Sequence, residues 1–473
     1  MSLTKVSYSM ISGAYANVLD FGAIGDGTTD DTAAIQAAIT FLGAGGGVVY
    51  FPVGTYRIST TVSTPSSSNG IVLLGSGLRT TFLKWTGGAS TMIFAHNGTD
   101  NFTMQGFALE NTGTGTIAVQ LNSVRCNIID IFTNPTVAWS DTIFSTVSTI
   151  ASYNYKVIFD NVNLFVSATG TAQADYAIKL GSGHTVTIQN SMFSGFAESA
   201  VFRDITVDTN VLNGLNITGT RFETFSGTAP NPGSINAIGI NLQYSAGVSI
   251  TGCNFEMAGD QIGSDNQYAI YIGVNVDGCA IYGNYFGAQG RCNYCVYVAA
   301  NSADAVSIDA NQFSRVVLAG VGAVSLLSLA KIQIGNNLAI SGPAIIVENT
   351  FTPTLTIGGA STGITYSEQE GRFIRYGKNL TYQVSVTLTS KGALTGDVRI
   401  GALPMGANSA LTLPNFVGSA WTLDLTAPIF VSSFMTNDGA TSIRLYKDDG
   451  TELQNTDITN TSSFIVQVTV LTA

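Results

Sequence analysis

Charged residues are scarce in this chain, and basic residues are the scarcest. Only 10% of its 473 residues are charged, and 19 Lys and Arg against 30 Asp and Glu give a formal net charge of -11. Because no basic stripe is available to neutralise phosphates, we expect no nucleic-acid partner. Helix-forming Lys, Glu and Arg are also too few for a helical solenoid.

Histidine and cysteine are nearly absent as well. The chain has two histidines, His96 and His184, which disfavours a Ser-His-Asp esterase. Its five cysteines are an odd number, which fits a chain made in a reducing cytosol. Cys292 and Cys295 form a single CxxC motif without a second pair or a histidine. We therefore expect no metal and no other cofactor.

Long apolar runs are missing too. The most apolar stretch, residues 316–330, is interrupted by glycines and serines and is too short to span a bilayer. Residues 1–16 contain one Lys and no apolar run, so they do not resemble a signal peptide. We therefore expect no membrane insertion.

What the chain does contain is an internal repeat. Nine apolar reference positions recur at intervals of 24 to 33 residues. Another apolar residue stands two residues before each of them. Two residues after them, eight of the nine repeats have Gly, Asn or Asp, which tolerate a left-handed backbone. This period and the strand–kink–strand pattern predict a solenoid built of β-strands. The reference positions are Met104, Ile128, Phe159, Ile188, Ile217, Ile250, Ile281, Ile308 and Ile334.

The regions that flank the repeat divide the chain into four parts. Residues 1–16 are interpreted as a lead-in or attachment segment, and residues 17–58 as a cap on the open end of the solenoid. The cap would contain an Ala-rich helix over residues 32–42, with Asp30 or Asp31 as its N-cap. Residues 59–342 would form the coils. Residues 350–473 lose the period and show alternating strands with Gly- and Asp-rich turns, which predicts a C-terminal β-sandwich.

Two stretches carry a resemblance to a known family. The run LDFGAIGDGTTDDTAAIQ within residues 17–39, followed by GGVVYFPVGTY at residues 46–56, resembles the start of pectate-lyase-like proteins, a superfamily that includes bacteriophage tailspikes. Segments TPTL at 352–355 and GRFIRYG at 371–377 resemble a small β-domain that ends many tail proteins.

The resemblance implies a right-handed parallel β-helix and a homotrimer in the tail of a virion. It implies a protein made in the host cytoplasm that acts at the bacterial surface, where it binds or depolymerises capsule, exopolysaccharide or O-antigen. The C-terminal β-sandwich would serve trimerisation or glycan binding. Large tailspikes often begin with a substantial particle-binding domain, whereas only about 16 residues precede the motif here. We therefore expect attachment through a phage tail or baseplate protein.

Catalysis must come from the outer face of the coils, because the apolar ladder fills the interior. Phe222 and Phe255 should point inward, so Glu223 and Glu256 should point outward from consecutive coils, roughly 5 Å apart. That separation is close to the 5–5.5 Å of retaining glycosidases, and two carboxylates so close should share one proton at neutral pH. We predict that this pair is the acid and nucleophile of a polysaccharide hydrolase.

Neighbouring side chains on the same coils would bind the substrate. Arg221 could orient a sugar, and Asn254 and Tyr285 would form an adjoining row with an aromatic face for a pyranose ring. Stacked glutamates can also merely solvate the surface, or pair with Arg across a trimer interface.

Other carboxylates and other functions remain open. Reserve catalytic candidates are Glu198 and Asp204, with Asp208, in the connection after Phe193, and Asp260, with Asp265, in the connection after Phe255. Glu198 and Asp260 share an offset of ten from their reference positions, which would put them about 9.6 Å apart if the loops were regular. A non-enzymatic receptor-binding fibre would have the same shape. A lyase that uses Lys179, Arg203 or Arg221 near a uronate is also open, although the acidic surface disfavours it.

Overall fold

The computed structural model describes residues 15–471 apart from short segments. Those segments are residues 97, 134–138, 147–155, 166–173, 197, 204–210, 225–237, 258–267, 288–293, 299–302, 314–321, 327–331, 335–336, 340–346, 377–378, 405–415, 428–430 and 436–441. The chain divides into two compact units, Met1–Ala323 with Lys331–Ala344, and Val324–Ala330 with Ile345–Ala473. The predicted lead-in, residues 1–16, lies almost wholly outside the described residues.

A helical cap opens the first unit. Helix α1 (Thr32–Leu42) begins and ends where the sequence predicts, and it buries Ile35, Ala38 and Ile39. Asp31 is its N-cap residue, but the Asp31 carboxylate accepts hydrogen bonds from the backbone N–H groups of Ile24 and Gly25 instead of capping the helix. The cap also contains the short helices η2 (Val18–Phe21) and η3 (Gly43–Gly45).

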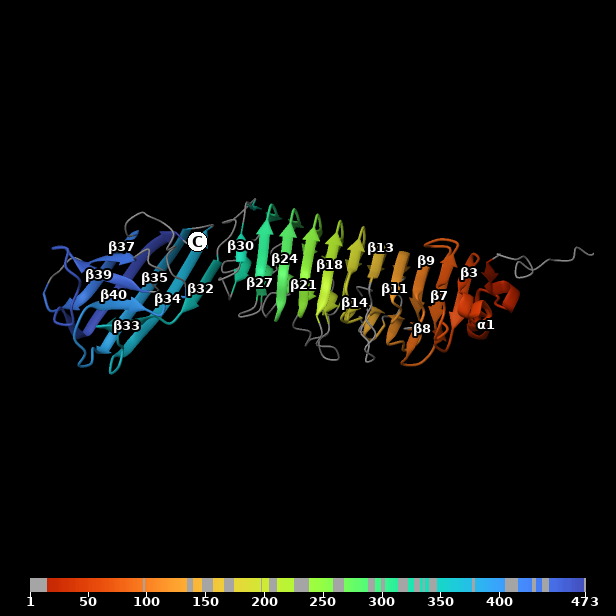
Figure 1. Cartoon of the computed structure of the whole chain (residues 1–473), viewed down its shortest axis with the longest axis horizontal. Coiled ribbons are helices and arrows are strands. Elements are labelled where there is room, and N and C mark those ends of the chain that lie inside the picture. The colour runs from red at the N-terminus through yellow and green to blue at the C-terminus, as the bar shows by residue number, and fades with distance from the viewer. Residues whose placement is uncertain are drawn as a thin grey trace, which may run out of the picture. The chain divides into compact units, whose positions relative to one another are not determined.

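Parallel strands follow and form a solenoid with two sheets (Figure 1). The larger sheet has 21 strands, and in most coils it receives two strands joined at a kink. These strands are β1 (Ala16–Asn17), β2 (Asp26–Asp30), β3 (Gly47–Phe51), β4 (Gly54–Ile58), β6 (Ile71–Gly75), β7 (Thr81–Trp85), β9 (Asn101–Asn111), β11 (Arg125–Thr133), β13 (Lys156–Phe165), β15 (Val186–Gln189), β16 (Met192–Ser194), β18 (Leu212–Thr218), β19 (Arg221–Thr224), β21 (Ser245–Thr251), β22 (Asn254–Met257), β24 (Val276–Tyr282), β25 (Tyr285–Phe286), β27 (Ala303–Asp309), β28 (Gln312–Phe313), β30 (Ile332–Ile334) and β31 (Leu338–Ala339).

The second sheet of the solenoid has ten parallel strands, one from each coil. They are β5 (Val62–Ser63), β8 (Thr91–Ala95), β10 (Ile117–Leu121), β12 (Thr142–Ser145), β14 (Tyr176–Leu180), β17 (Ser199–Arg203), β20 (Ile238–Leu242), β23 (Tyr268–Ile272), β26 (Tyr294–Val298) and β29 (Gly322–Leu326).

The predicted apolar ladder stacks in register. Strand pairing joins all nine reference positions into one column that runs from Met104 to Ile334. Asp130, Asn161 and Asn190 have φ between 52° and 54°, so the kink residues adopt the left-handed conformation that the sequence predicts. Ala310, the one kink residue that is not Gly, Asn or Asp, adopts it as well, with φ 53°. The parallel β-helix is therefore confirmed.

The second unit contains a nine-stranded antiparallel sheet, which is consistent with the predicted β-sandwich. Alternate side chains such as Tyr382, Val384 and Val466 are buried on one face, so that face forms the core of the unit. The strands, in their order across the sheet, are β32 (Val347–Phe351), β34 (Thr365–Tyr376), β35 (Asn379–Ser390), β40 (Ile458–Leu471), β37 (Phe416–Leu425), β38 (Val431–Met435), β39 (Ile443–Lys447), β36 (Val398–Gly401) and β33 (Thr354–Ile357). Among the residues described, no helix is long and apolar enough to cross a membrane.

Candidate functional site

Glu223 and Glu256 lie on neighbouring strands of the solenoid, as the sequence predicts. Strand β19 pairs with β22 so that Glu223 stands opposite Glu256, one coil away. The flanking Phe222 and Phe255 are buried, and their rings stack face to face at 4.8 Å. Because side chains alternate along a strand, this interior stack turns both glutamates outward.

Arg221 lies between the two carboxylates. Its Nη2 is 2.5 Å from Glu223 Oε1 and 2.7 Å from Glu256 Oε2. The distance between Glu223 Oε1 and Glu256 Oε2 is therefore at most the sum of those two distances. Such a separation is compatible with the about 5–5.5 Å between the two carboxyl groups of a retaining glycosidase. The hydrogen bond to Glu256, together with the charges of both glutamates, raises the pKa of Arg221 in spite of partial desolvation.

This bridge adds a component that the sequence argument left out. The sequence predicts that Arg221 orients a sugar and that the two glutamates share one proton. In the structure the guanidinium places a positive charge between them. Its side chain is 46% exposed, so it can move away when a ligand enters.

The predicted substrate-binding row is also in register. Arg221 pairs with Asn254, and Asn254 pairs with Tyr285 on the next coil. Asn254 Nδ2 lies 3.5 Å from Glu256 Oε1. The Oδ1 atom of Asn254 is buried and has no hydrogen-bond partner among the described residues.

Only one of the reserve carboxylates can be described. Asp204, Asp208, Asp260 and Asp265 lie outside the described residues, whereas Glu198 is exposed and directly precedes strand β17. Strand register joins Ser199 to Ile238 and Ile238 to Tyr268. Asp260 lies outside the described residues, so the predicted spacing between Glu198 and Asp260 stays a prediction.

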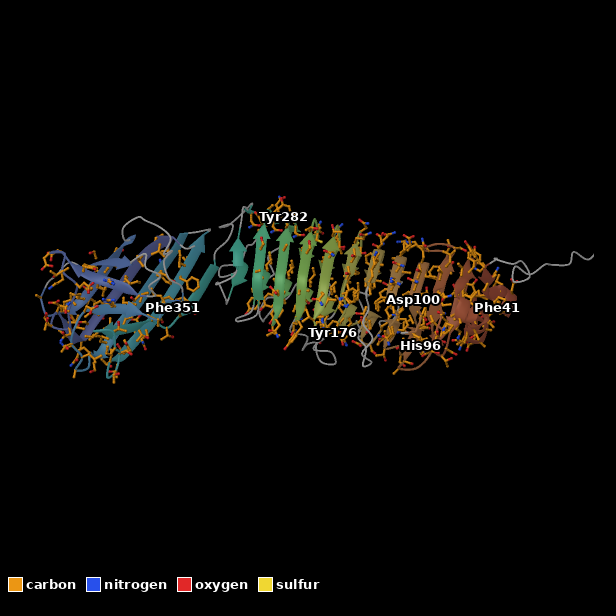
Figure 2. The ribbon with its side chains drawn as sticks, in the orientation of Figure 1. Phe41, His96, Asp100, Tyr176, Tyr282 and Phe351 are labelled. Carbon is orange, nitrogen blue, oxygen red and sulfur yellow. The ribbon has the colours of Figure 1, made fainter. Side chains whose placement is uncertain are left out.

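Glu198 belongs to a cluster that the sequence argument missed. Tyr176, labelled in Figure 2, donates a hydrogen bond from its Oη to Glu198 and stacks on Phe202 with ring centroids 4.5 Å apart. Lys179 Nζ lies 5.1 Å from the centre of the Tyr176 ring and 2.9 Å from Asp141 Oδ1. Tyr176 and Lys179 come from β14, and Phe202 comes from β17, both in the ten-stranded sheet.

Burial shapes the ionisation of this cluster. It raises the pKa of Asp175, and the nearby charges of Glu198 and Asp141 add to the effect. Burial and the hydrogen bond to Glu198 also raise the pKa of Tyr176 far above its ordinary value. Tyr176 therefore stays protonated at neutral pH and is a poor general base.

Further aromatic rings continue along the same sheet. Strand register runs from Lys179 through Phe202 and Asn241 to Tyr271 and Tyr297. The rings of Tyr271 and Tyr297 stack with centroids 5.4 Å apart. The sequence carries a signal for this column. Strands β17, β23 and β26 read SAVFR, YAIYI and YCVYV, and each has an aromatic residue at its fourth position. This column and the Tyr176 cluster together form the outer aromatic face of the ten-stranded sheet.

The two groups of residues are connected by a short segment. Ser194, which pairs with Glu223, ends β16, and β17 begins five residues later at Ser199. An extended chain spans at most about 3.6 Å per residue, so the Tyr176 cluster begins within roughly 20 Å of the glutamate pair.

Two residues considered for other chemistry lie inside the protein. Arg203 is fully buried, and its Nη1 donates to the Leu180 carbonyl oxygen at 3.3 Å. It cannot face a bound uronate. Cys295 of the CxxC motif is buried, and Cys292 lies outside the described residues. Within the described part of the chain, no group of three or more His, Cys, Asp or Glu is arranged to hold a metal ion.

Comparison with known proteins supports the family resemblance. Residues 15–221 match the family described as "Rhamnogalacturonase A/epimerase, pectate lyase-like". Mannuronan C5-epimerase AlgE3 of Azotobacter vinelandii is 41% identical over 105 residues, which are 20% of this chain and 6% of that protein. Alginate lyase 7 of the same organism is 46% identical over 80 residues, which are 15% of this chain and 9% of the lyase. The chain thus spans only a small part of these curated relatives.

Among solved structures, the enzymatically active domain of tailspike protein 2 of bacteriophage CBA120 is similar. The similarity has a TM-score of 0.48 and 14% identity, and it covers 94% of this chain and 70% of that one. The pectate-lyase-like resemblance predicted from residues 17–56 is confirmed by the family match.

Proposed function

Starting from a pectate-lyase-like β-helix, we propose that this chain is a phage tailspike subunit that binds a bacterial surface polysaccharide and hydrolyses it. The single observation that carries the proposal is the carboxylate pair. Glu223 and Glu256 stand opposite each other on consecutive coils, and one Arg221 nitrogen contacts both.

The proposed reaction follows the retaining mechanism. One glutamic acid protonates the leaving glycosidic oxygen while the other carboxylate attacks the anomeric carbon, which gives a glycosyl-enzyme. The first glutamate then takes a proton from water as the water oxygen replaces the enzyme carboxylate on the sugar. Arg221 must leave at least one carboxylate when the sugar enters, and it can then bind substrate hydroxyls.

The outer aromatic face of the ten-stranded sheet would bind the chain beyond the cleavage point. Tyr176 and Phe202 form one aromatic platform, and Tyr271 and Tyr297 form another two coils further on. Asp141, Asp175 and Glu198 outnumber Lys179 beside the first platform, and the whole chain is acidic. A neutral glycan fits this surface better than a polyuronate does.

Lyase or epimerase activity is the second candidate, because the family and the relatives carry those names. Such chemistry needs a base for a sugar C–H proton and a cation near the uronate carboxylate. Around the Tyr176 cluster, the tyrosine holds its proton, Lys179 is paired with Asp141, and Arg203 is buried. Hydrolysis therefore remains our preferred reaction, and a binding-only fibre is the non-enzymatic alternative.

Assembly is part of the proposal. The sequence resemblance to tailspikes supports a homotrimer in the virion tail, attached to a tail or baseplate protein. Light scattering of the full chain checks the oligomeric state, and a monomer at micromolar concentration would contradict the trimer.

The function is tested by incubating the protein with purified polysaccharide from candidate host bacteria. A fall in viscosity without the ultraviolet absorbance of an unsaturated uronate indicates a hydrolase. New absorbance of that kind indicates a lyase, and binding without cleavage indicates an adhesin. Glu223→Gln is the matched control, because a genuine hydrolase activity of this site disappears in it.

A further inference from the structure

The C-terminal unit presents an unusual outer surface. On the face opposite its core, strand register aligns three short rows of side chains across β34, β35, β40 and β37. The first row is Arg372, Gln383, Gln467 and Ser419; the second is Glu370, Ser385, Ile465 and Trp421; the third is Glu368, Thr387, Ser463 and Leu423. We call these twelve residues the Trp421 face.

An indole is exposed beside a row of amides on this face. Trp421 is 55% exposed and stands opposite Ile465, which is 49% exposed. The neighbouring row offers the side-chain amides of Gln383 and Gln467, about 7 Å away along the strands. A surface depression of about 740 Å³ is lined by both glutamines and by Ser385 and Ile465, among others.

We infer that the Trp421 face binds a neutral saccharide, at a site separate from the glutamate pair of the β-helix. A pyranose ring has an apolar C–H face and a hydroxyl-bearing edge. The indole of Trp421 offers a flat apolar platform for the first, and the glutamine amides offer donors and acceptors for the second. From Trp421 to Glu370 the second row crosses three strand spacings, about 14 Å, which is long enough for more than one sugar ring.

Charge decides the class of glycan. The charged residues of the Trp421 face are Glu368, Glu370 and Arg372, so the surface is slightly negative. Glu368 already accepts hydrogen bonds from Ser385 Oγ at 3.0 Å and from Thr387 Oγ1 at 3.2 Å. With one cation against two carboxylates, a polyuronate or a nucleic acid would be repelled.

A second copy of this chain suits the face less well. The core of a homo-oligomer interface is strongly apolar, and about 800 Å² is buried on each partner. Only Trp421, Leu423 and Ile465 are exposed large apolar residues here, and serine, threonine, glutamine and charged residues make up the rest of the face. Burying those polar groups against a copy of themselves would leave many without partners.

Tryptophan fluorescence gives a site-specific test. The chain has three tryptophans. Trp85 and Trp139 are buried, whereas Trp421 is exposed, so acrylamide quenches mainly Trp421. The full chain carrying Glu223→Gln, which removes a proposed catalytic carboxylate, is titrated with neutral malto-, manno- and galacto-oligosaccharides and with alginate oligomers. We expect at least one neutral oligosaccharide to protect the exposed tryptophan in a saturable way.

Substitutions complete the test. By calorimetry, Trp421→Ala should weaken binding of that oligosaccharide at least about tenfold, and Trp421→Tyr should restore most of it. Tyr282→Ala removes an equally exposed aromatic ring from the β-helix and should change nothing. The inference is overturned if no neutral oligosaccharide protects Trp421, if only alginate does, or if Trp421→Ala binds like its parent. It is also overturned if Trp421→Ala dissociates an oligomer in light scattering, which would assign the face to a second copy. Cleavage is not a readout, so the hydrolase proposal fails or succeeds separately.

Discussion

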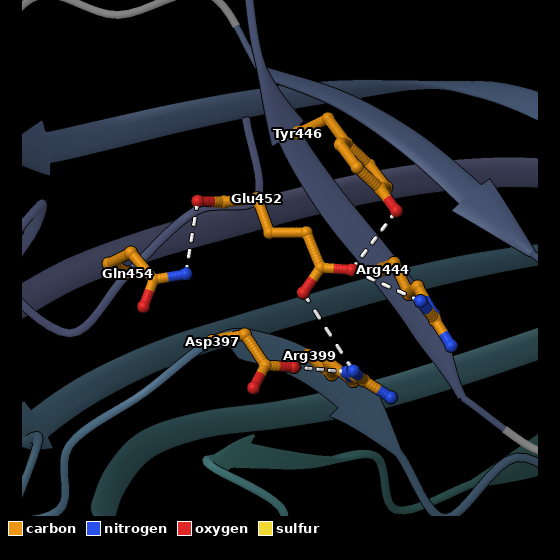
Figure 3. A network of polar contacts seen from close by, with 6 residues as sticks. All are labelled: Asp397, Arg399, Arg444, Tyr446, Glu452 and Gln454. Carbon is orange, nitrogen blue, oxygen red and sulfur yellow. Dashed lines mark hydrogen bonds and ion pairs between the residues drawn. The ribbon is translucent and has the colours of Figure 1, made fainter. Parts of the chain in front are cut away.

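Each unit of the chain contains an arginine–carboxylate network, and the two networks differ in the partners of their carboxylates. In the β-helix, Arg221 is the only basic residue seen to contact Glu223 and Glu256 among the described ion pairs, and it is nearly half exposed. In the C-terminal unit, Glu452 Oε1 accepts hydrogen bonds from Arg444 at 3.1 Å and from Tyr446 at 3.0 Å, and Arg399 lies 3.8 Å from Oε2 (Figure 3). Arg399 also pairs with Asp397.

The surroundings of the second network explain its role. Tyr446 and Glu452 form an antiparallel bridge across a tight turn, and Asp397 forms another with Gln454. Side chains and backbone therefore fasten the same turn to the sheet. The Arg221 network joins β19 to β22, two strands whose register the buried Phe222–Phe255 stack also fixes. Arg399 and Arg444 are 30% and 28% exposed and Tyr446 joins them on Glu452, so we call this network enclosed. The bridging Arg221 is 46% exposed, so we call its network open.

Removing a carboxylate from the open network gives the largest expected effect. Glu223→Gln and Glu256→Gln should each lower glycan cleavage at least about 10²–10⁴-fold, because an amide neither donates the proton nor attacks the anomeric carbon. Stability should change by no more than about 1 kcal/mol, because each variant leaves Arg221 paired with the other glutamate. Initial rates of reducing-end release and a thermal melt check the two parts. Normal turnover in either variant would move the search to Glu198, Asp204 and Asp260.

The enclosed network should show the reverse pattern. Glu452→Gln should lower the stability of the C-terminal unit by about 1–3 kcal/mol, because Arg444 and Arg399 lose their shared carboxylate. Cleavage should not change. Calorimetric melting measures the first effect, and unchanged melting together with altered cleavage would invert our comparison.

Arg221 itself should have an intermediate effect. Arg221→Met removes the cation that contacts both carboxylates, so the pH–rate profile of glycan cleavage should differ from the parent's. High salt should shrink the difference between variant and parent. Arg125→Met is the matched control, since Arg125 is an exposed arginine 3.9 Å from Asp100 and outside the site. A profile identical to the parent's would show that Arg221 does not govern the pair.

The smallest effect concerns the turn beside the enclosed network. Hydrogen bonds from the Thr451 hydroxyl and backbone N–H hold the pKa of Asp449 below its ordinary value. Because this folded-state pKa is depressed, the stabilisation is present above the unfolded value near 3.8 and is lost as pH falls through the lowered value. Asp449→Asn should therefore melt slightly below the parent at pH 7 and together with it in strong acid. A difference that persists in strong acid would refute this linkage.

Much of the fold could be predicted because the apolar interior columns determine the register of the β-helix strands. An Ile–Ile or Phe–Phe column leaves one register that buries every ladder residue, and a one-residue slip would turn the ladder to solvent. Glu223 and Glu256 follow Phe222 and Phe255 directly, so the register of the phenylalanines also aligns the glutamates. Their proximity could therefore be predicted too. The position of Arg221 between them could not, because it depends on the rotamers of three long side chains.

The Tyr176 cluster shows where counting along the sequence fails. The connections that precede the ten-stranded sheet differ in length between coils, so an offset from the reference position does not carry across them. Glu198 and Asp260 share such an offset, but Asp260 lies outside the described residues, so their spacing stays a prediction. Strand pairing after those connections brings together Asp141, Asp175 and Tyr176, and this pairing cannot be read from sequence offsets.

The stereochemistry of cleavage tests the carboxylate pair most directly. Proton NMR of the sugar released in the first minutes of reaction reports the configuration of its new anomeric centre. A close pair that acts through a glycosyl-enzyme predicts retention of configuration, and Glu223→Gln should release no such product. Inversion, or an unsaturated uronate as the product, would contradict the assignment of Glu223 and Glu256 as acid and nucleophile.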